Sequence, residues 1–142
     1  MPNFPRISGR VMPMNLLLDT HTFLWWAHDP ARLSRTAYAA LYDLQHTLYL
    51  SVASIWEIQI KIQIGKLILP KPLAHVVENQ QHINNLQLLT IAPAHIYQLD
   101  TLPLHHKDPF DRMILAQAFA ENCTIVSVDG VFSQYGAPVL WE

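Results

Sequence analysis

From residue 14 onward, short apolar runs alternate with longer segments of helical periodicity. The apolar runs are predicted to be strands, at 14–19, 47–51, 86–91, 123–128 and 137–141. The segments between them are predicted to be helices, at 21–28, 34–45, 52–64, 72–84, 93–101 and 109–122. Strands that alternate with helices in this way indicate an α/β protein whose parallel sheet carries helices on both faces.

One segment supports two interpretations. Residues 58–64 alternate strictly between isoleucine and a polar residue, which taken alone is typical of a strand. The apolar positions across 52–67 also fall near helical spacing, and Ser51 and Ser54 are good helix caps. A strand here would follow the one at 47–51 without room for a turn. We therefore predict a helix.

The chain divides into a short leader and one domain. Residues 1–13 contain three prolines and show no periodicity, so we expect a flexible leader, with Met14 as the point where the folded pattern begins. Residues 14–142 then form a single domain. The lone Cys123 excludes an internal disulfide and a cysteine-rich zinc site. No apolar run reaches the roughly 18 residues of a membrane span, and we expect a cytoplasmic protein.

Composition bears on partners. Apolar residues make up 51% of the chain and charged residues only 14%, well below the usual fraction. So little polar surface favours a homo-oligomer, such as a homodimer, or a permanent partner. The formal net charge of −2 gives no global attraction to nucleic acid. That argument weakens if several of the acids cluster around a metal ion.

Four acidic residues occupy positions that a parallel sheet would bring together. Asp19 ends the first apolar run and Asp129 ends another, whereas Glu57 and Asp111 fall early in segments that follow a strand or a loop. Ligands of open α/β sheets bind beyond the carboxyl ends of the strands. Four carboxylates converging there would repel one another unless a cation neutralised them, and oxygen ligands suit Mg²⁺ or Mn²⁺. The set therefore predicts metal-assisted chemistry, most naturally on a phosphate.

Each acid also has an ordinary structural explanation. The alternatives are a turn after Asp19, a capping box from Ser54 to Glu57 or an ion pair of Glu57 with Lys61, a helix cap at 108–111, and a turn at 129–130. Taken singly, these explanations are at least as good as a functional one. Four independent capping positions would not, however, need to share one edge of one sheet.

Other polar and aromatic residues give weaker signals. The eight histidines show no zinc-ligand spacing, but His21 follows Asp19 closely, and His105 and His106 lie in a loop before Asp108. Lys107 and Arg112 flank Asp111 as candidate phosphate contacts. The tryptophans at 25, 26 and 56 are expected in the core or at an interface rather than as base-stacking platforms.

The order of these segments resembles the PIN-domain ribonucleases, in particular the VapC-type toxins of prokaryotic toxin–antitoxin pairs. The matching segments are LLLDTHTFLW at 16–25, LSVASIWEI at 50–58, GKL at 65–67, HHKDPFDRMILAQA at 105–118 and IVSVDGVF at 125–132. The resemblance implies a three-layer α/β/α fold and an endoribonuclease that hydrolyses RNA phosphodiesters. An antitoxin protein would be its partner.

The resemblance also implies roles for particular residues. Asp19, Glu57, Asp111 and Asp129 would bind Mg²⁺ or Mn²⁺ and would be catalytic, with a water activated by the bound ion as the nucleophile. Five further residues are candidate outer contacts or substrate contacts: Thr20, His21, Asp108, Arg112 and Ser127.

Two other functions stay open at this point. A phosphatase of the haloacid-dehalogenase kind also begins with an Asp at a strand end, but it needs a second Asp two residues later, where this chain has His21. A metal-free α/β module that binds a partner through apolar surface is the alternative outside enzymes.

Overall fold

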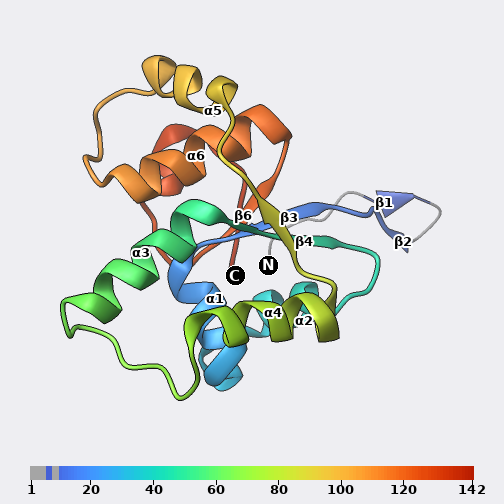
Figure 1. The fold of residues 1–142 in the computed structure, drawn as a ribbon. Coiled ribbons are helices and arrows are strands. Elements are labelled where there is room, and N and C mark those ends of the chain that lie inside the picture. Colours follow the sequence, from blue (N-terminus) through green and yellow to red (C-terminus); the bar gives the residue numbers. More distant parts are fainter. Residues whose placement is uncertain (1–5, 8–9) are drawn as a thin grey trace.

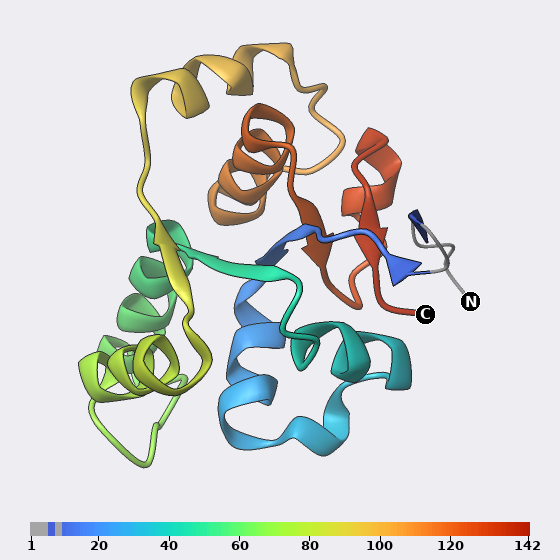
Figure 2. The same ribbon diagram turned by 90° about the vertical axis from the view of Figure 1, so that its right-hand side faces the viewer.

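A five-stranded parallel sheet forms the centre of the computed structural model, which describes residues 6–7 and 10–142 (Figures 1 and 2). The strand order is β5-β4-β3-β6-β7, and every pairing is parallel. The strands are β3 (Asn15–Leu18), β4 (Thr47–Ser51), β5 (Gln87–Leu89), β6 (Thr124–Val126) and β7 (Val139–Leu140). The predicted α/β class and parallel sheet are confirmed.

Helices cover both faces of this sheet. The α-helices are α1 (Thr20–His28), α2 (Arg35–Leu41), α3 (Val52–Gln63), α4 (Leu73–Asn84), α5 (Pro93–Gln98) and α6 (Pro109–Glu121). Short 3-10 turns are η1 (Pro30–Arg32), η2 (Leu99–Thr101) and η3 (Phe132–Tyr135). In Figure 1, α5 and α6 lie above the sheet, and α1, α2 and α4 lie below it. The three-layer α/β/α architecture is therefore confirmed.

Helix α3 settles the segment with two interpretations, and helix α2 is shorter than predicted. Residues 58–63 belong to helix α3 and Ile64 is its C-cap, so the predicted helix is confirmed and the strand alternative was wrong. The Ser51 hydroxyl accepts from the Ala53 N–H at 3.0 Å and caps the start of the helix. Helix α2 ends at Leu41, earlier than the predicted residue 45. Its continuation is replaced by a turn in which the Asp43 carboxylate accepts from the Gln45 N–H at 3.0 Å, a local bond that competes with helix.

Alternating side chains of β3 divide the core in two. Leu16 and Leu18 are fully buried against α1, α2 and α4, together with Phe23 and Trp26. Leu17 points to the opposite face and packs with the buried side of α6. The period of two along a strand thus explains why one leucine run serves both helical layers.

The sheet changes its direction of winding beside β3. The chain passes from β3 to β4 and β5 on one side, then crosses through α5 and α6 to β6 on the other side. Ligand sites of such sheets lie at the carboxyl ends of the strands where this reversal occurs. Asp19 directly follows β3, its N–H donates to the Val126 carbonyl at 3.2 Å, and Ser127 directly follows β6. The topology places these two residues at the switch point.

The predicted leader lies partly outside the described residues, which begin with strand β1 (Arg6–Ile7) and, after a gap at 8–9, strand β2 (Arg10–Val11). These two strands pair antiparallel, apart from the main sheet. A domain boundary at residue 14 stays a prediction. Within residues 6–7 and 10–142, no helix has the length and apolarity needed to cross a membrane.

Candidate active site

Asp19 is held rigidly by the strand end and by the helix that it begins. Its Oδ1 accepts from the Thr22 N–H at 2.8 Å. Asp19 is therefore the N-cap of α1, which agrees with the ordinary interpretation of a turn into the next helix. Its Oδ2 accepts from the Ser127 hydroxyl at 2.5 Å, across the gap between β3 and β6. The residue is buried, with 6% exposure, although nothing about capping a helix requires burial.

Ser127 connects two of the acidic residues. Besides donating to Asp19, its buried hydroxyl accepts from the Asp129 N–H at 3.0 Å. The Asp129 Oδ1 accepts from the Val131 N–H at 3.0 Å, which forms the turn that the sequence predicted, and Asp129 itself is exposed. One serine therefore sets the position of Asp129 relative to Asp19.

Glu57 reaches the site from the second turn of α3. The Thr20 hydroxyl donates to its Oε1 at 2.6 Å, and Lys61 Nζ lies 3.2 Å from its Oε2. The ion pair with Lys61 confirms one ordinary interpretation of this residue. The capping box with Ser54 was wrong, because the helix begins at Val52 and Ser51 is its cap.

Asp108 and Asp111 sit at the N-terminus of α6. Asp108 is the cap, accepting from the N–H groups of Phe110 (2.9 Å) and Asp111 (3.1 Å), as the sequence predicted. The carboxylate of Asp111 is free of that role, and its Oδ2 lies 2.8 Å from His106 Nε2.

Burial raises the pKa of Asp111 from 3.8 to about 6. The charges of Asp108 and Glu57 push the pKa in the same direction, while the hydrogen bond and the charge of His106 oppose it. The raised pKa of Asp111 is therefore due first to burial, with smaller contributions from the two neighbouring carboxylates.

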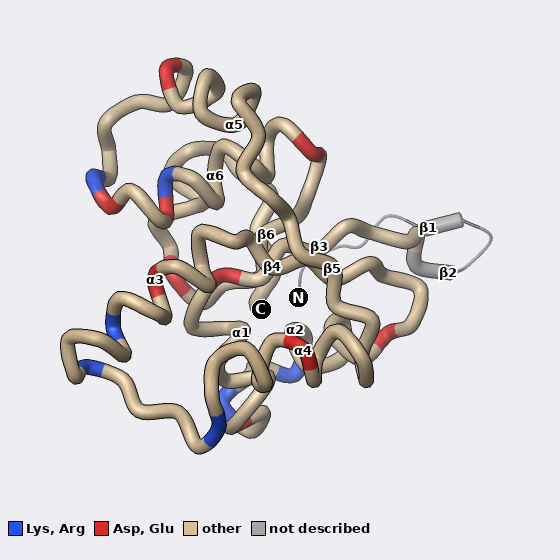
Figure 3. The backbone as a smooth tube through the Cα atoms, in the orientation of Figure 1, with Lys and Arg blue, Asp and Glu red and all other residues tan. Residues whose placement is uncertain are grey.

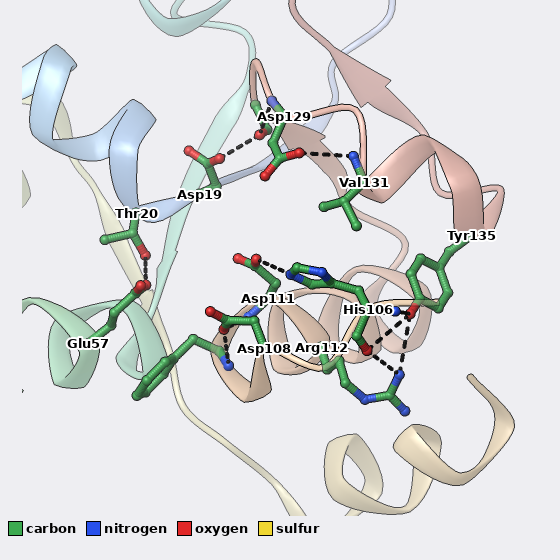
Figure 4. Close-up of polar contacts among 12 residues, drawn as sticks. Asp19, Thr20, Glu57, His106, Asp108, Asp111, Arg112, Asp129, Val131 and Tyr135 are labelled. Carbon is green, nitrogen blue, oxygen red and sulfur yellow. Dashed lines mark hydrogen bonds and ion pairs between the residues drawn. The ribbon is translucent and has the colours of Figure 1, made fainter. Parts of the chain in front are cut away.

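The side chains of the acidic residues surround one open space (Figure 4). Asp19 and Asp129 enter it from the strand ends, Asp108 and Asp111 from α6, and Glu57 from α3 on the side of Thr20. Figure 3 shows the same gathering of acidic positions between α3 and α6. Residues spread over more than a hundred positions of sequence thus face one region of the molecule in this view. The predicted metal set of Asp19, Glu57, Asp111 and Asp129 stays a prediction, because among the described residues only His106, Asp108 and Asp111 form a group of three whose possible ligand atoms lie within 4.8 Å of one another.

The donor set fits a hard divalent cation. Carboxylate oxygens dominate. Burial is the main cause of the raised pKa of Asp111, and a cation would offset the smaller contributions from the charges of Asp108 and Glu57. His106, Asp108 and Asp111 each offer one ligand atom, and these atoms lie within 4.8 Å of one another. His106 is the residue whose role the sequence left open. The histidine pair was visible there, but only the path of the loop before α6 brings one of its members to Asp111.

His21 contacts an aromatic neighbour and lines a groove. Its exposed ring packs against Trp25, with centroids 6.1 Å apart, and it lines a groove of about 480 Å³ formed by 21–32 and 61–70. Lys61 connects this groove with the acidic residues, since it lines the groove and forms an ion pair with Glu57. Lys107 is exposed beside Asp108.

Arg112 is engaged in holding a loop. Its Nη1 donates to the carbonyl oxygens of Pro103 (2.9 Å) and His106 (3.3 Å), and its Nη2 to those of Leu99 and Leu102 (both 3.3 Å). A guanidinium that is committed to four carbonyls positions the segment carrying His106. This geometry favours a positioning role over the phosphate contact that the sequence suggested.

Comparisons with known proteins match most of the chain to one type of domain and one fold. A family model of the PIN domain matches residues 16–138. Ribonuclease VapC22 of Mycobacterium tuberculosis is 30% identical over 117 residues, which are 80% of this chain and 86% of that protein. Among solved structures, one similar fold is that of VapBC2 from Rickettsia felis, bound to a DNA fragment from its promoter. The two chains superimpose with a TM-score of 0.69 at 16% identity, and the match covers 91% of this chain and 100% of that one.

A second solved structure has the same fold. It is VapBC-5 from Mycobacterium tuberculosis, a member of the VapBC family of toxin–antitoxin systems. Its TM-score is 0.56 at 15% identity, and the match covers 90% of this chain and 97% of that one.

Proposed function

Since this chain belongs to the PIN-domain family and resembles VapC toxins in sequence and fold, we propose that it is a divalent-metal-dependent endoribonuclease. The single observation that carries the proposal is the convergence of Asp19, Glu57, Asp111 and Asp129 on one crevice at the switch point of the sheet. A bound Mg²⁺ or Mn²⁺ would supply charge neutralisation for a phosphodiester and an activated water. The relative VapC22 is itself a ribonuclease by name.

The residues of the chain have distinct tasks in this proposal. Asp19 is oriented from two sides, by Thr22 and Ser127, so it can present its carboxylate without rearrangement. Thr20 and Lys61 orient Glu57 in the same way. His106 contacts the Asp111 carboxylate at 2.8 Å. Loss of an outer contact of this kind typically costs about 10- to 100-fold in metal affinity or activity.

A matched pair of proteins tests the nuclease function. Purified wild type and Asp19→Asn are incubated with single-stranded RNA and with duplex DNA, each with Mg²⁺ and with EDTA. We expect wild type with Mg²⁺ to cut RNA, and the other combinations to leave it intact. Sequencing the new 5′ ends after expression of either protein then identifies the RNA. Equal ends in both samples, or equal attack on duplex DNA, would overturn the assignment.

A protein partner of the antitoxin type belongs to the same proposal. Both structural neighbours are VapBC proteins, and one is a member of a toxin–antitoxin family. Here the groove next to Lys61 combines apolar residues such as Leu24 and Leu67 with the cations Arg32 and Lys66. A partner segment with apolar and acidic residues would fit it. Phe23 and Trp26 are buried in the core and are not available to a partner, whereas Trp25 lines this groove.

Co-purification from the native host tests this partner, and the mass of the isolated protein tests the expected homodimer. A chain that is isolated alone as a non-toxic monomer would contradict both. The rival interpretation, a metal-free interaction module, is tested by thermal shift with Mg²⁺, because a ligand that binds only the folded state raises its stability. A module without a metal site would show no shift.

A further inference from the structure

Two aromatic rings stand in contact beside the proposed site. Trp56 of α3 and Phe110 of α6 have ring centroids 5.3 Å apart, with planes at 80° to one another. Trp56 is 61% exposed, and Phe110 is partly exposed. The two rings are arranged edge to face, nearly perpendicular to one another, and much of the indole surface is accessible to solvent.

Trp56 differs from the other tryptophans of the chain. Trp26 is only 3% exposed, and Trp25 packs against Trp141 with centroids 5.8 Å apart. The sequence predicted that Trp56 would also lie in the core or at an interface, but the described residues leave most of its surface open. Its apolar surface therefore needs an explanation other than packing within the domain.

The position of the pair relative to the acids supplies that explanation. Trp56 immediately precedes Glu57, and Phe110 immediately precedes Asp111. Neighbouring residues on a helix project about 100° apart. When the acid of each helix faces the crevice, the aromatic residue before it lies beside the crevice. Two helices repeat this arrangement, and the two rings meet.

We propose that Trp56 and Phe110 form a stacking platform for an unpaired nucleobase next to the phosphate that is cleaved. This inference rests on the proposed nuclease function and adds the determinant of substrate class: an RNA strand with an unstacked base at the site. Base–aromatic stacking tolerates any sequence, because every base has a π-face. A base that is paired in a duplex cannot reach the platform.

The charge of the site explains why stacking is needed. Carboxylates repel phosphates, the formal net charge of the chain is −2, and the guanidinium of Arg112 is committed to loop carbonyls. Apart from the proposed metal ion and Lys107, the crevice therefore offers few positive groups to bind phosphate. Stacking does not depend on charge. It holds the strand where the acids, by themselves, would repel it.

The experiment compares Trp56→Ala, Trp56→Phe and Ile64→Ala on one single-stranded RNA substrate. Ile64 is a matched control: it is the C-cap of the same helix, is 59% exposed, and lies about two turns beyond Glu57. We expect Trp56→Ala to raise KM by about 5- to 150-fold, with kcat less affected. Trp56→Phe, which keeps an aromatic face, should recover most of the loss, and Ile64→Ala should match wild type.

A second arm replaces the nucleotides on either side of the cleaved bond, one at a time, by abasic analogues. One of these substrates should lose affinity for wild type as much as Trp56→Ala does, and combining the two changes should add nothing further. Equal KM for wild type and Trp56→Ala would overturn the platform. So would a Trp56→Ala protein whose oligomer mass differs from that of wild type and of Ile64→Ala, since the ring would then serve a protein interface.

Failure of the platform and failure of the nuclease function remain distinguishable. If wild type cuts RNA with Mg²⁺ but Trp56→Ala does so equally well, only the platform is wrong. If wild type cuts no RNA at all, the binding of a 2-aminopurine RNA still tests the platform: quenching by wild type and not by Trp56→Ala supports stacking. The absence of any difference in that assay contradicts it.

Discussion

His106 Nε2 lies 2.8 Å from Asp111 Oδ2, and this contact joins the loop before α6 to an acid whose pKa is raised to about 6. Arg112 holds the same loop from behind through its carbonyls. The position of the Asp111 carboxylate therefore depends on His106, and the position of His106 depends on Arg112.

Activity should depend on pH through Asp111. Its pKa in the folded protein is about 6, and a carboxyl group must lose its proton to bind a cation. Mg²⁺-dependent cleavage is thus expected to be low at pH 5, to rise through pH 6 and to level off above pH 7. Rates at saturating RNA over this range provide the measurement. A profile without change between pH 5 and 7 would contradict the role of Asp111.

Removing the charge of Asp111 should abolish activity without unfolding the protein. Its pKa is raised above the unfolded value of 3.8, so this group favours folding at low pH, and that contribution is lost as pH rises through about 6. At pH 7 without metal, Asp111→Asn should have a Tm equal to or above that of wild type, with cleavage reduced about 100-fold or more.

Calorimetry and a cleavage assay on the same preparation check the Asp111→Asn prediction. Mg²⁺ should raise the Tm of wild type and not that of the variant. Asp100→Asn removes an exposed acid outside the crevice and is the matched control, with normal cleavage expected. An unfolded Asp111→Asn would favour a purely structural role for the carboxylate.

Ser127→Ala should weaken both stability and catalysis. The buried hydroxyl donates to Asp19 and accepts from the Asp129 N–H, so its loss leaves an Asp19 oxygen without that donor. We expect the free energy of unfolding to fall by about 1–3 kcal/mol. Urea denaturation measures this change, and Ser133→Ala, at an exposed serine, should leave stability unchanged. A fully stable and fully active Ser127→Ala would show that the two acids are oriented by other contacts.

Thr20 is expected to act through Glu57. Thr20→Val keeps the shape of the side chain but removes the donor 2.6 Å from Glu57 Oε1, while Thr20→Ser keeps the hydroxyl. Removing an outer contact of this kind typically lowers metal affinity or activity by about 10- to 100-fold. Titration of cleavage with Mg²⁺ should show a higher half-saturating concentration for Thr20→Val only. If Thr20→Ser is equally impaired, the hydrogen bond is not the reason.

Arg112→Ala tests whether this residue positions the loop or binds substrate. Loss of its bonds to four carbonyl oxygens should lower the free energy of unfolding, by about 1–3 kcal/mol, and should reduce kcat through displacement of His106. A phosphate contact would instead raise KM and leave stability unchanged. Denaturation and steady-state kinetics on one sample separate the two outcomes.

The predicted boundary at residue 14 is open to a direct test. The Met14 N–H donates to His46 Nδ1 at 3.0 Å, and its carbonyl accepts from Thr47, so the ladder with β4 starts there. A chain that begins at Met14 should fold with a cooperative transition and cleave RNA normally. Loss of either property would place residues 1–13 within the functional domain.

Much of this architecture was determined by the sequence through local rules. Apolar runs separated by helical periodicity predicted the parallel sheet, and the Asp108-Pro109 pair predicted the start of α6. Acids at the ends of separate strands also predicted a shared crevice, because parallel strands present their carboxyl ends at one edge. These inferences depend on period and position along the chain, which a sequence contains directly.

The tertiary structure alone decided which side chains meet. The pairing of Ser127 with Asp19, Thr20 with Glu57 and His106 with Asp111 depends on how the strands are ordered and how one loop returns to α6. The exposure of Trp56 was decided in the same way, because a helix position becomes core or rim only when its neighbours are placed. Sequence spacing carries no information on such contacts, since they are made between elements whose relative positions follow from packing of the whole core.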